Sequence, residues 1–253
     1  MANRKTTAQF ISEAIAVHGD KYDYSNTEYK NSRTNVNITC PIHGEFYQKP
    51  NAHLHGHGCL RCHMETTKTL IYGVGYNDLL YTKGQPFYKH WFAMLSRCYQ
   101  QHKNDRNDSY KNCSVCEPWH TLSNFKAWFE KPDNGYRSGY HLDKDILVKN
   151  NTIYSPETCC FVPPRINTLM IKGKSKRNKY PIGTHRVRSG KFSARGGLNT
   201  YLGTFNTPEE AFNAYKIAKE QHIKELANKY FKEGKITQRV YDALMKYEVE
   251  ITD

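Results

Sequence analysis

The chain has 253 residues, and its 37 lysines and arginines against 24 aspartates and glutamates give a formal net charge of +13. Apolar residues are spread too thinly over this length for one large core, so two or three small domains are expected. The charge favours a polyanionic partner. Nucleic acid is favoured over a membrane because no apolar run approaches the roughly 20 residues that span a bilayer.

The first elements are predicted by periodicity. Apolar residues recur at helical spacing from Thr7 to His18, which predicts a short amphipathic helix. The stretch Val36–Thr39 alternates like a strand, and Gly44–Gln48 can pair with it across a tight turn. Residues 67–86 show little periodicity and are expected to be a linker.

Two pairs of metal-ligating residue types follow, Cys40-Pro-Ile-His43 and Cys59-Leu-Arg-Cys62. Each pair is spaced to bind one ion, so we predict a tetrahedral zinc site in a treble-clef or ribbon-like module over residues 1–66. Zinc would supply stability that so small a core cannot. Four nearby histidines compete with His43 for its role: His53, His55, His57 and His63.

The N-terminus lacks the apolar segment of a secretory signal, so we expect a cytoplasmic protein with reduced thiols. Cys113 and Cys116 form a second Cys-x-x-Cys pair, but no clear partner pair follows it. Core packing is the favoured interpretation of these two thiols, unless the fold brings Cys98, Cys159 or Cys160 close to them.

The middle of the chain predicts two helices and then a hairpin. The helices are expected from Tyr88 to Gln101 and from Leu122 to Glu130. After them the pattern predicts strand, turn, strand and helix, at His141–Val148, Asn150-Asn151, Cys160–Val162 and from Arg165 onward.

The stretch Tyr140-His-Leu-Asp-Lys-Asp-Ile-Leu, followed by Tyr154-Ser-Pro-Glu-Thr-Cys-Cys-Phe-Val-Pro-Pro-Arg-Ile-Asn167, resembles phage HNH endonucleases of the homing type. The resemblance takes in Phe87 to Asn167 and implies a nuclease-like domain over residues 87–172. It further implies that Asp143 and Asn167 bind one divalent ion, magnesium or manganese, and that Lys144 occupies the position of the general-base histidine.

The sequence departs from the HNH family pattern at two positions, Lys144 and Thr158. A lysine with an ordinary pKa near 10.4 is a poor base at neutral pH unless that pKa falls by about three units. Lys144 could instead stabilise phosphate charge while His141 or a metal-bound water acts as the base. Thr158 stands where the family commonly has the asparagine that fixes the hairpin.

On the predicted strand His141, Asp143 and Asp145 share one face, which would gather a water activator and oxygen ligands. The alternative is a retained HNH-like fold whose Asp-Lys-Asp stretch is an ordinary solvated strand and whose Asn167 caps a helix.

The last third predicts a small sheet and two helices. Residues 173–179 are basic and unpatterned, as in a linker or an arm along phosphates. Three short strands are expected at Gly183–Val187, Lys191–Arg195 and Thr200–Phe205. A helix begins after Thr207 with proline and two acids in its first turn, and a final helix is expected over Thr237–Tyr247.

The segments Tyr180-Pro-Ile-Gly183, Lys191-Phe192-Ser-Ala194-Arg195 and Tyr201-Leu202-Gly203-Thr204-Phe205 resemble the Apetala/ethylene-response-factor DNA-binding domain. The resemblance implies that residues 180–253 form a domain that lays a three-stranded sheet in the major groove of double-stranded DNA. Arg186, Arg188 and Arg195 suit guanine edges or phosphates, and Lys191 suits phosphate. Tyr201 could stack or contact sugar, or belong to the core.

These patterns together predict an α+β, multidomain, site-directed DNA endonuclease, phage-encoded and located in the host cytoplasm, with no small-molecule cofactor. One competing hypothesis is a non-catalytic phage regulator that keeps the DNA reader. Another is a protein-binding role for the zinc module within a phage assembly.

Overall fold

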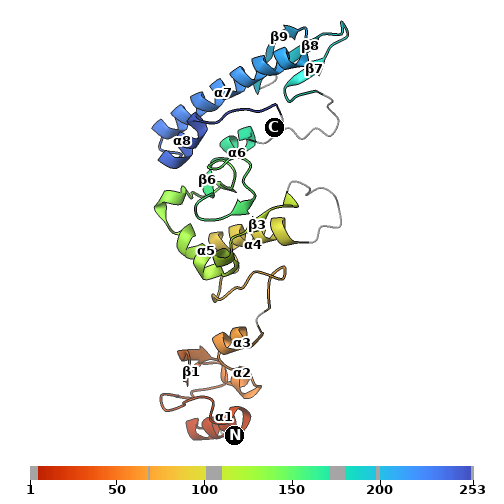
Figure 1. Ribbon diagram of the computed structural model, residues 1–253. Helices are drawn as coiled ribbons and strands as arrows, with labels where there is room; N and C mark the ends of the chain where they lie inside the picture. Colours follow the sequence, from red (N-terminus) through yellow and green to blue (C-terminus); the bar gives the residue numbers. More distant parts are fainter. Residues whose placement is uncertain (1–4, 68, 101–109, 171–179, 198–199, 252–253) are drawn as a thin grey trace. The chain divides into compact units, whose positions relative to one another are not determined.

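The computed structural model describes residues 5–67, 69–100, 110–170, 180–197 and 200–251. It confirms a mixed α+β fold with small sheets. The chain divides into two compact units (Figure 1). The first comprises Met1–Ile71 with Tyr76–Thr82, and the second comprises Tyr72–Gly75 with Lys83–Asp253. None of the described helices is both long and apolar enough to cross a membrane.

The first unit begins with α1 (Thr7–His18), as predicted. The Thr6 hydroxyl accepts a hydrogen bond from the backbone N–H of Gln9, and the Gln9 side chain accepts one from the backbone N–H of Thr6. These two bonds satisfy backbone donors that a helix start otherwise leaves unpaired. The helix ends at Gly19, whose φ of 63° lies in the left-handed region.

The predicted hairpin of the first unit is confirmed as β1 (Val36–Cys40) and β2 (Gly44–Gln48), which pair antiparallel. Two short helices follow, α2 (Pro50–Leu54) and α3 (Leu60–Thr67). The core between these elements consists of Phe10, Ala14, Tyr22, Tyr24, Val36, Ile38, Cys40, Cys59 and Cys62. Between α3 and α4 the described residues hold neither a helix nor an extended strand, and the linker over residues 67–86 stays a prediction.

The second unit opens with an aromatic core. Helices α4 (Pro86–Tyr99) and α5 (Leu122–Phe129) pack together, and the Trp91 indole donates a hydrogen bond to the Trp119 carbonyl at 2.7 Å. Two 3₁₀ turns, η2 (Glu117–His120) and η3 (Pro132–Asn134), flank α5. Strand β3 (Ser114–Val115) pairs in parallel with β5 (Ile153–Tyr154).

The predicted strand, strand and helix order is observed as β4 (His141–Asp143), β6 (Cys160–Val162) and α6 (Pro164–Met170), with β4 and β6 antiparallel. The prediction of a strand through Val148 was wrong. Oδ1 of Asp143 accepts hydrogen bonds from the backbone N–H groups of Asp145 and Ile146, which turns the chain out of the strand. Asp145 therefore does not continue the strand face of His141 and Asp143.

The predicted three-stranded sheet is formed by β7 (Thr184–Arg186), β8 (Phe192–Arg195) and β9 (Tyr201–Phe205), in that order and antiparallel. Because β7 ends at Arg186, Arg188 lies in the turn before β8 and not on a strand as expected. Helix α7 (Pro208–Lys232) packs on this sheet and is longer than the pattern indicated, and α8 (Gln238–Met245) follows it. Residues 173–179, the predicted basic linker, lie outside the described residues.

One core joins the middle of the chain to its last two helices. It contains Ile146, Cys160, Val162 and Ile166 together with Ile223, Leu226 and Ala227 of α7, Ile236, and Val240 and Leu244 of α8. The first half of α7 instead buries Phe212 and Tyr215 beside Val249. The boundary between two separate domains stays a prediction, but α7 takes part in the packing of both regions.

Candidate functional site

A four-residue cluster in the first unit could hold a metal ion. Ligand atoms of Cys40, His43, Cys59 and Cys62 all lie within 4.8 Å of one another. The first two residues flank the turn between β1 and β2, and the other two lie at the start of α3. The fold therefore brings the four predicted ligands together. The histidine of the cluster is His43 and none of the four alternative histidines.

The spacing inside the cluster fits one tetrahedral ion. The Sγ atoms of Cys40 and Cys62 are 3.6 Å apart, and Nδ1 of His43 lies 3.3 to 3.7 Å from the three sulfur atoms. Ligands held about 2.0–2.3 Å from a tetrahedral ion are separated from one another by about 3.5–3.8 Å. Four of the six ligand pairs thus have about the separation that such an ion requires.

The surroundings of two of the thiols act in opposite directions, because burial raises the pKa of Cys62 to about 11 while the pKa of Cys40 falls. Burial works to raise the pKa of the Cys40 thiol, but the backbone N–H groups of Ile42 and His43 outweigh it and lower that pKa to about 7. The thiolate is the form that binds metal. Nε2 of His43 lies 3.0 Å from a carboxylate oxygen of Glu65, which orients the ring and leaves Nδ1 facing the sulfur atoms.

His53 has a different role from a ligand. Its ring is fully buried, and Nδ1 donates toward Gln48 Oε1 and the His57 carbonyl, both at 3.0 Å. Nε2 therefore accepts from the Tyr24 hydroxyl at 2.8 Å. Burial, with the neighbouring His18, lowers the pKa of His53 to about 4. His53 is a neutral, hydrogen-bonded core residue.

In the second unit, the hairpin and helix bring His141 and Asn167 together. The Asn167 side chain on α6 lies 3.2 Å from Nδ1 of His141 on β4. Asp143 is two residues along the same strand, so its side chain emerges on the His141 face. Burial and the nearby Asp145 raise the pKa of Asp143, although backbone N–H groups oppose this. Both of those backbone bonds use Oδ1.

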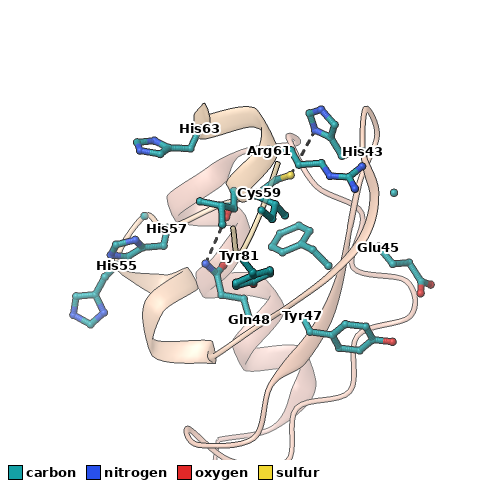
Figure 2. Close-up of a pocket in the computed structure, with 16 residues that line it drawn as sticks. His43, Glu45, Tyr47, Gln48, His55, His57, Cys59, Arg61, His63 and Tyr81 are labelled. Carbon is teal, nitrogen blue, oxygen red and sulfur yellow. Dashed lines mark hydrogen bonds between the residues drawn. The ribbon is translucent and has the colours of Figure 1, made fainter. Parts of the chain in front are cut away.

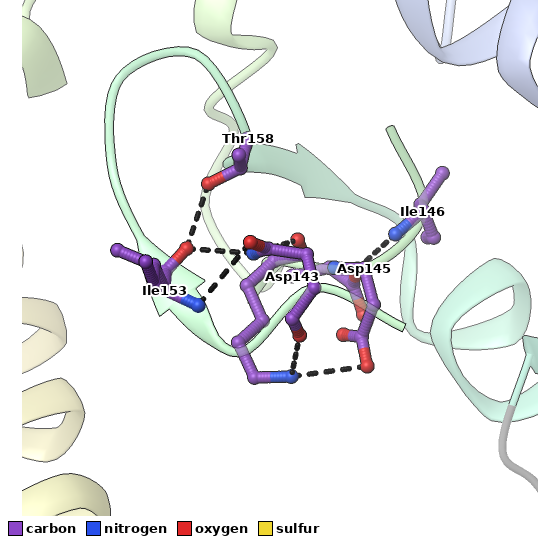
Figure 3. A network of polar contacts seen from close by, with 7 residues as sticks. Asp143, Asp145, Ile146, Ile153 and Thr158 are labelled. Carbon is purple, nitrogen blue, oxygen red and sulfur yellow. Dashed lines mark hydrogen bonds and ion pairs between the residues drawn. The ribbon is translucent and has the colours of Figure 1, made fainter. Parts of the chain in front are cut away.

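Lys144 turns away from this face. Its buried ammonium group donates to Asp145 at 3.0 Å and to the Asn151 carbonyl at 2.9 Å (Figure 3). Burial alone would lower the pKa of Lys144, but the Asp145 carboxylate outweighs it and raises that pKa. The depressed pKa that a general-base lysine needs is absent, so Lys144 and Asp145 hold the turn after β4.

Asn151 is a residue whose role the sequence reasoning missed. Its amide donates to the carbonyls of Lys144 and Ile153 at 2.8 and 2.6 Å and accepts from the Ile153 N–H at 3.2 Å. Thr158 adds a 2.8 Å bond to the Ile153 carbonyl (Figure 3). Asn151 and Thr158 thus together fix the hairpin loop. The Asn150-Asn151 turn was predicted, and this pair was the available signal.

His90 on α4 was also missed. Burial, followed by the charges of Arg97 and His141, lowers its pKa. Its ring centroid lies 4.9 Å from that of Phe161 and 5.8 Å from that of Tyr136. Nothing in the sequence distinguishes His90 from any other histidine in a helix, so its place among these aromatic rings could not be predicted. Cys113 and Cys116 are not part of a metal cluster among the residues that the structure describes.

The basic residues proposed to contact DNA lie at the surface of the three-stranded sheet. Arg186, Lys191, Arg195 and Tyr201 are exposed, and so is Arg188 in the turn. Tyr201 is 59% exposed, which excludes the core interpretation, and its hydroxyl pairs with that of Thr204 at 2.7 Å. Helix α7 packs on this sheet, and the Tyr215 ring lies against Gly183.

Residues 3–63 match a family described as a protein of unknown function, DUF723, and this stretch contains all four ligands of the metal cluster. The chain is also similar to uncharacterized proteins of Acanthamoeba polyphaga mimivirus. One is 48% identical over 48 residues, 19% of this chain and 18% of the relative. A second is 44% identical over 52 residues, 21% and 19%. A third is 45% identical over 62 residues, 24% and 23%.

The chain spans about a fifth of the length of the curated relatives it matches. No solved structure gives a significant match to the chain.

Proposed function

We propose that the chain is a metal-dependent DNA endonuclease of the HNH homing type that reads double-stranded DNA with its C-terminal sheet. The observation that carries this proposal is the contact of His141 on β4 with Asn167 on α6, beside Asp143 on the same strand face. The paired strands and following helix have the order that the resemblance to HNH endonucleases implies.

In this proposal His141 accepts the proton of the attacking water. An amide can present either its nitrogen or its oxygen to a ring, and an amide oxygen has two lone pairs. The structure has Nδ2 of Asn167 facing Nδ1 of His141, and turning the amide over would put Oδ1 there to accept from Nδ1–H, which leaves Nε2 of His141 as the proton acceptor. A magnesium or manganese ion held by Asp143 and Asn167 would supply positive charge beside the scissile phosphate.

The C-terminal sheet would supply the affinity for DNA. Arg186, Arg188, Lys191 and Arg195 are exposed on or beside its strands, and the second unit carries 29 basic against 17 acidic residues. Clustered guanidinium groups suit phosphates and guanine edges, and their affinity falls as salt rises.

The first unit, in this proposal, is a treble-clef-like module whose ion is a structural zinc. Its hairpin turn and the start of α3 supply two ligands each, and no ligand position is left for a substrate. The chain is similar in part to viral proteins, which accords with a phage or viral origin.

Nicking of supercoiled DNA with magnesium or manganese tests the proposal. The His141→Ala substitution should lower the rate by about 10²–10⁴-fold, because it removes the proton acceptor. Asn167→Ala should also lower it, whereas Asn167→Asp retains an oxygen for both partners and should keep most activity. Glu130→Gln, on the surface at the end of α5, is the matched control. Nicking that survives His141→Ala would contradict this assignment.

A non-catalytic DNA-binding regulator is the second candidate. The observation that favours it is the position of Lys144, which is held by Asp145 and the Asn151 carbonyl and does not face His141. Salt-dependent binding of duplex DNA without any metal-dependent nicking by the wild-type protein would select this second function.

A further inference from the structure

A hollow of about 740 Å³ lies in the first unit beside the metal cluster, and neither resemblance assigns it a role. Strand β2, the loop of residues 55–58, the start of α3 and the segment Leu80-Tyr81 line it (Figure 2). Its volume falls in the range of about 300–1,000 Å³ that is usual for ligand sites. The hollow is therefore large enough for a planar ring and its substituents.

Two exposed tyrosines are among the residues that line this hollow. Tyr47 on β2 is 67% exposed and Tyr81 is 87% exposed. Tyr81 has a φ of 54°, in the left-handed region that a bulky residue adopts only at a cost in free energy. Because so little of its ring is buried, a face of the Tyr81 ring can be covered by a stacked partner.

The lining carries one permanently charged cation, Arg61, and one acidic side chain, Glu45. The imidazoles that share the lining are His43, His55, His57 and His63. Figure 2 places Arg61 near His43, with His55 and His57 on the other side of Tyr81. Aromatic rings together with a guanidinium group are what an unpaired nucleotide needs, since one binds the base and the other the phosphate.

We infer that this hollow binds an unpaired nucleotide of a single-stranded nucleic acid, with the base on Tyr47 or Tyr81 and the phosphate beside Arg61. Duplex DNA is a poorer fit. The first unit carries 8 basic against 7 acidic residues, so it lacks the broad positive surface that a duplex backbone favours. Stacking on tyrosine accepts any base, and Arg61 supplies a cation for the phosphate.

The test uses the full-length, metal-loaded protein and a short thymidine oligonucleotide that carries 5-iodouracil. Irradiation followed by mass spectrometry should place cross-links at Tyr47 or Tyr81. In titrations the double variant Tyr47→Ala, Tyr81→Ala should lose about tenfold or more in affinity for the single strand, since each stacked base contributes a factor of about 5 or more. Tyr81→Phe should keep the affinity, because the ring remains.

Two controls separate this inference from the proposed endonuclease function. Ile42→Ala, at a 73% exposed position of the same hairpin turn, should change nothing. Tyr201→Ala should weaken duplex binding and leave the cross-links in the first unit. Metal content, measured for each variant, shows that the unit remains folded. Cross-links confined to residues 180–205, or single-strand affinity unchanged in the double variant, would overturn the inference whether or not the protein cuts DNA. Displacement of the cross-links by a peptide but not by unlabelled thymidine oligonucleotide would overturn it as well.

Discussion

The two units of the chain differ in what holds them together and in the charge they carry. In the first unit, three of the nine buried core residues are the cysteines of the metal cluster, and basic and acidic residues nearly balance. In the second unit the core joins distant stretches of sequence, and basic residues exceed acidic ones by 29 to 17. The stability of a small core can thus depend on a bound metal ion, whereas a larger core can stabilise a unit whose surface carries an excess of basic residues.

The largest expected effect is the loss of the metal. Chelation, or Cys59→Ser, should unfold the first unit alone, because binding of a structural ion contributes about 10–16 kcal/mol to such modules. Hydrogen exchange would show residues 7–67 losing protection while residues 110–170 keep theirs. His63→Ala, a nearby histidine outside the cluster, is the control. Protection that persists after complete metal removal would show that the hydrophobic core suffices.

The second unit should instead depend on its shared core. Leu244 on α8 is 1% exposed, and Leu244→Ala should lower the free energy of unfolding by about 2–5 kcal/mol. Denaturant titration gives the size of the effect, and hydrogen exchange should show that β6 and α6 lose protection along with α8. Ile217→Ala, at a 70% exposed position of α7, should change stability by less than about 0.5 kcal/mol. If the protection of β6 and α6 were unchanged, these elements and α8 would belong to two separate cores.

A smaller effect concerns the acid sensitivity of the first unit. The pKa of the fully buried His53 is lowered from 6.5 to about 4, so the folded state favours the neutral ring. This contribution is complete above pH 6.5 and is lost as the pH falls from 6.5 through 4, by about 3 kcal/mol in all. The wild type should therefore lose stability over this interval more steeply than His53→Gln.

The comparison is made between proteins of equal metal content, since acid also releases thiolate-bound metal. Parallel stability curves for the wild type and His53→Gln would show that folding does not lower the pKa of His53.

The smallest expected effect tests the difference in charge. Arg195→Ala should weaken duplex binding by about 1–3 kcal/mol if the guanidinium contacts a base, and it should reduce the salt slope by about one if it contacts a phosphate. Lys49→Ala, at an exposed position of the first unit, should leave both quantities unchanged. Titration of a labelled duplex at several salt concentrations measures both. Equal effects from the two variants would show that both units bind the duplex.

Sequence patterns predicted the elements whose signal is local. The α1 helix has the predicted bounds, and the ligand spacing of Cys40, His43, Cys59 and Cys62 was enough to predict the cluster. Ligand pairs on a tight turn and a helix start constrain the geometry so strongly that few arrangements remain.

The errors came from side chains that bond to the backbone and from contacts between distant residues. The alternation of apolar and polar residues predicted a strand to Val148. The strand ends earlier because the Asp143 carboxylate accepts hydrogen bonds from two backbone N–H groups that follow it. Arg188 fell in a turn because β7 closes on β8 after Arg186. The continuation of α7 beyond Ala218 depends on packing against Val162 and Ile166, which lie far away in the sequence. No local pattern carries that information.

The shared core also sets the order in which the protein can mature during synthesis. Ile146, Val162 and Ile166 leave the ribosome well before Ile223 and Leu244, with which they pack. Until α8 has emerged, this side of the hairpin that carries His141 has no apolar cover, and a chain still being translated lacks the support that holds the hairpin in place. The His141 and Asn167 arrangement is therefore fully supported only after α8 has been made.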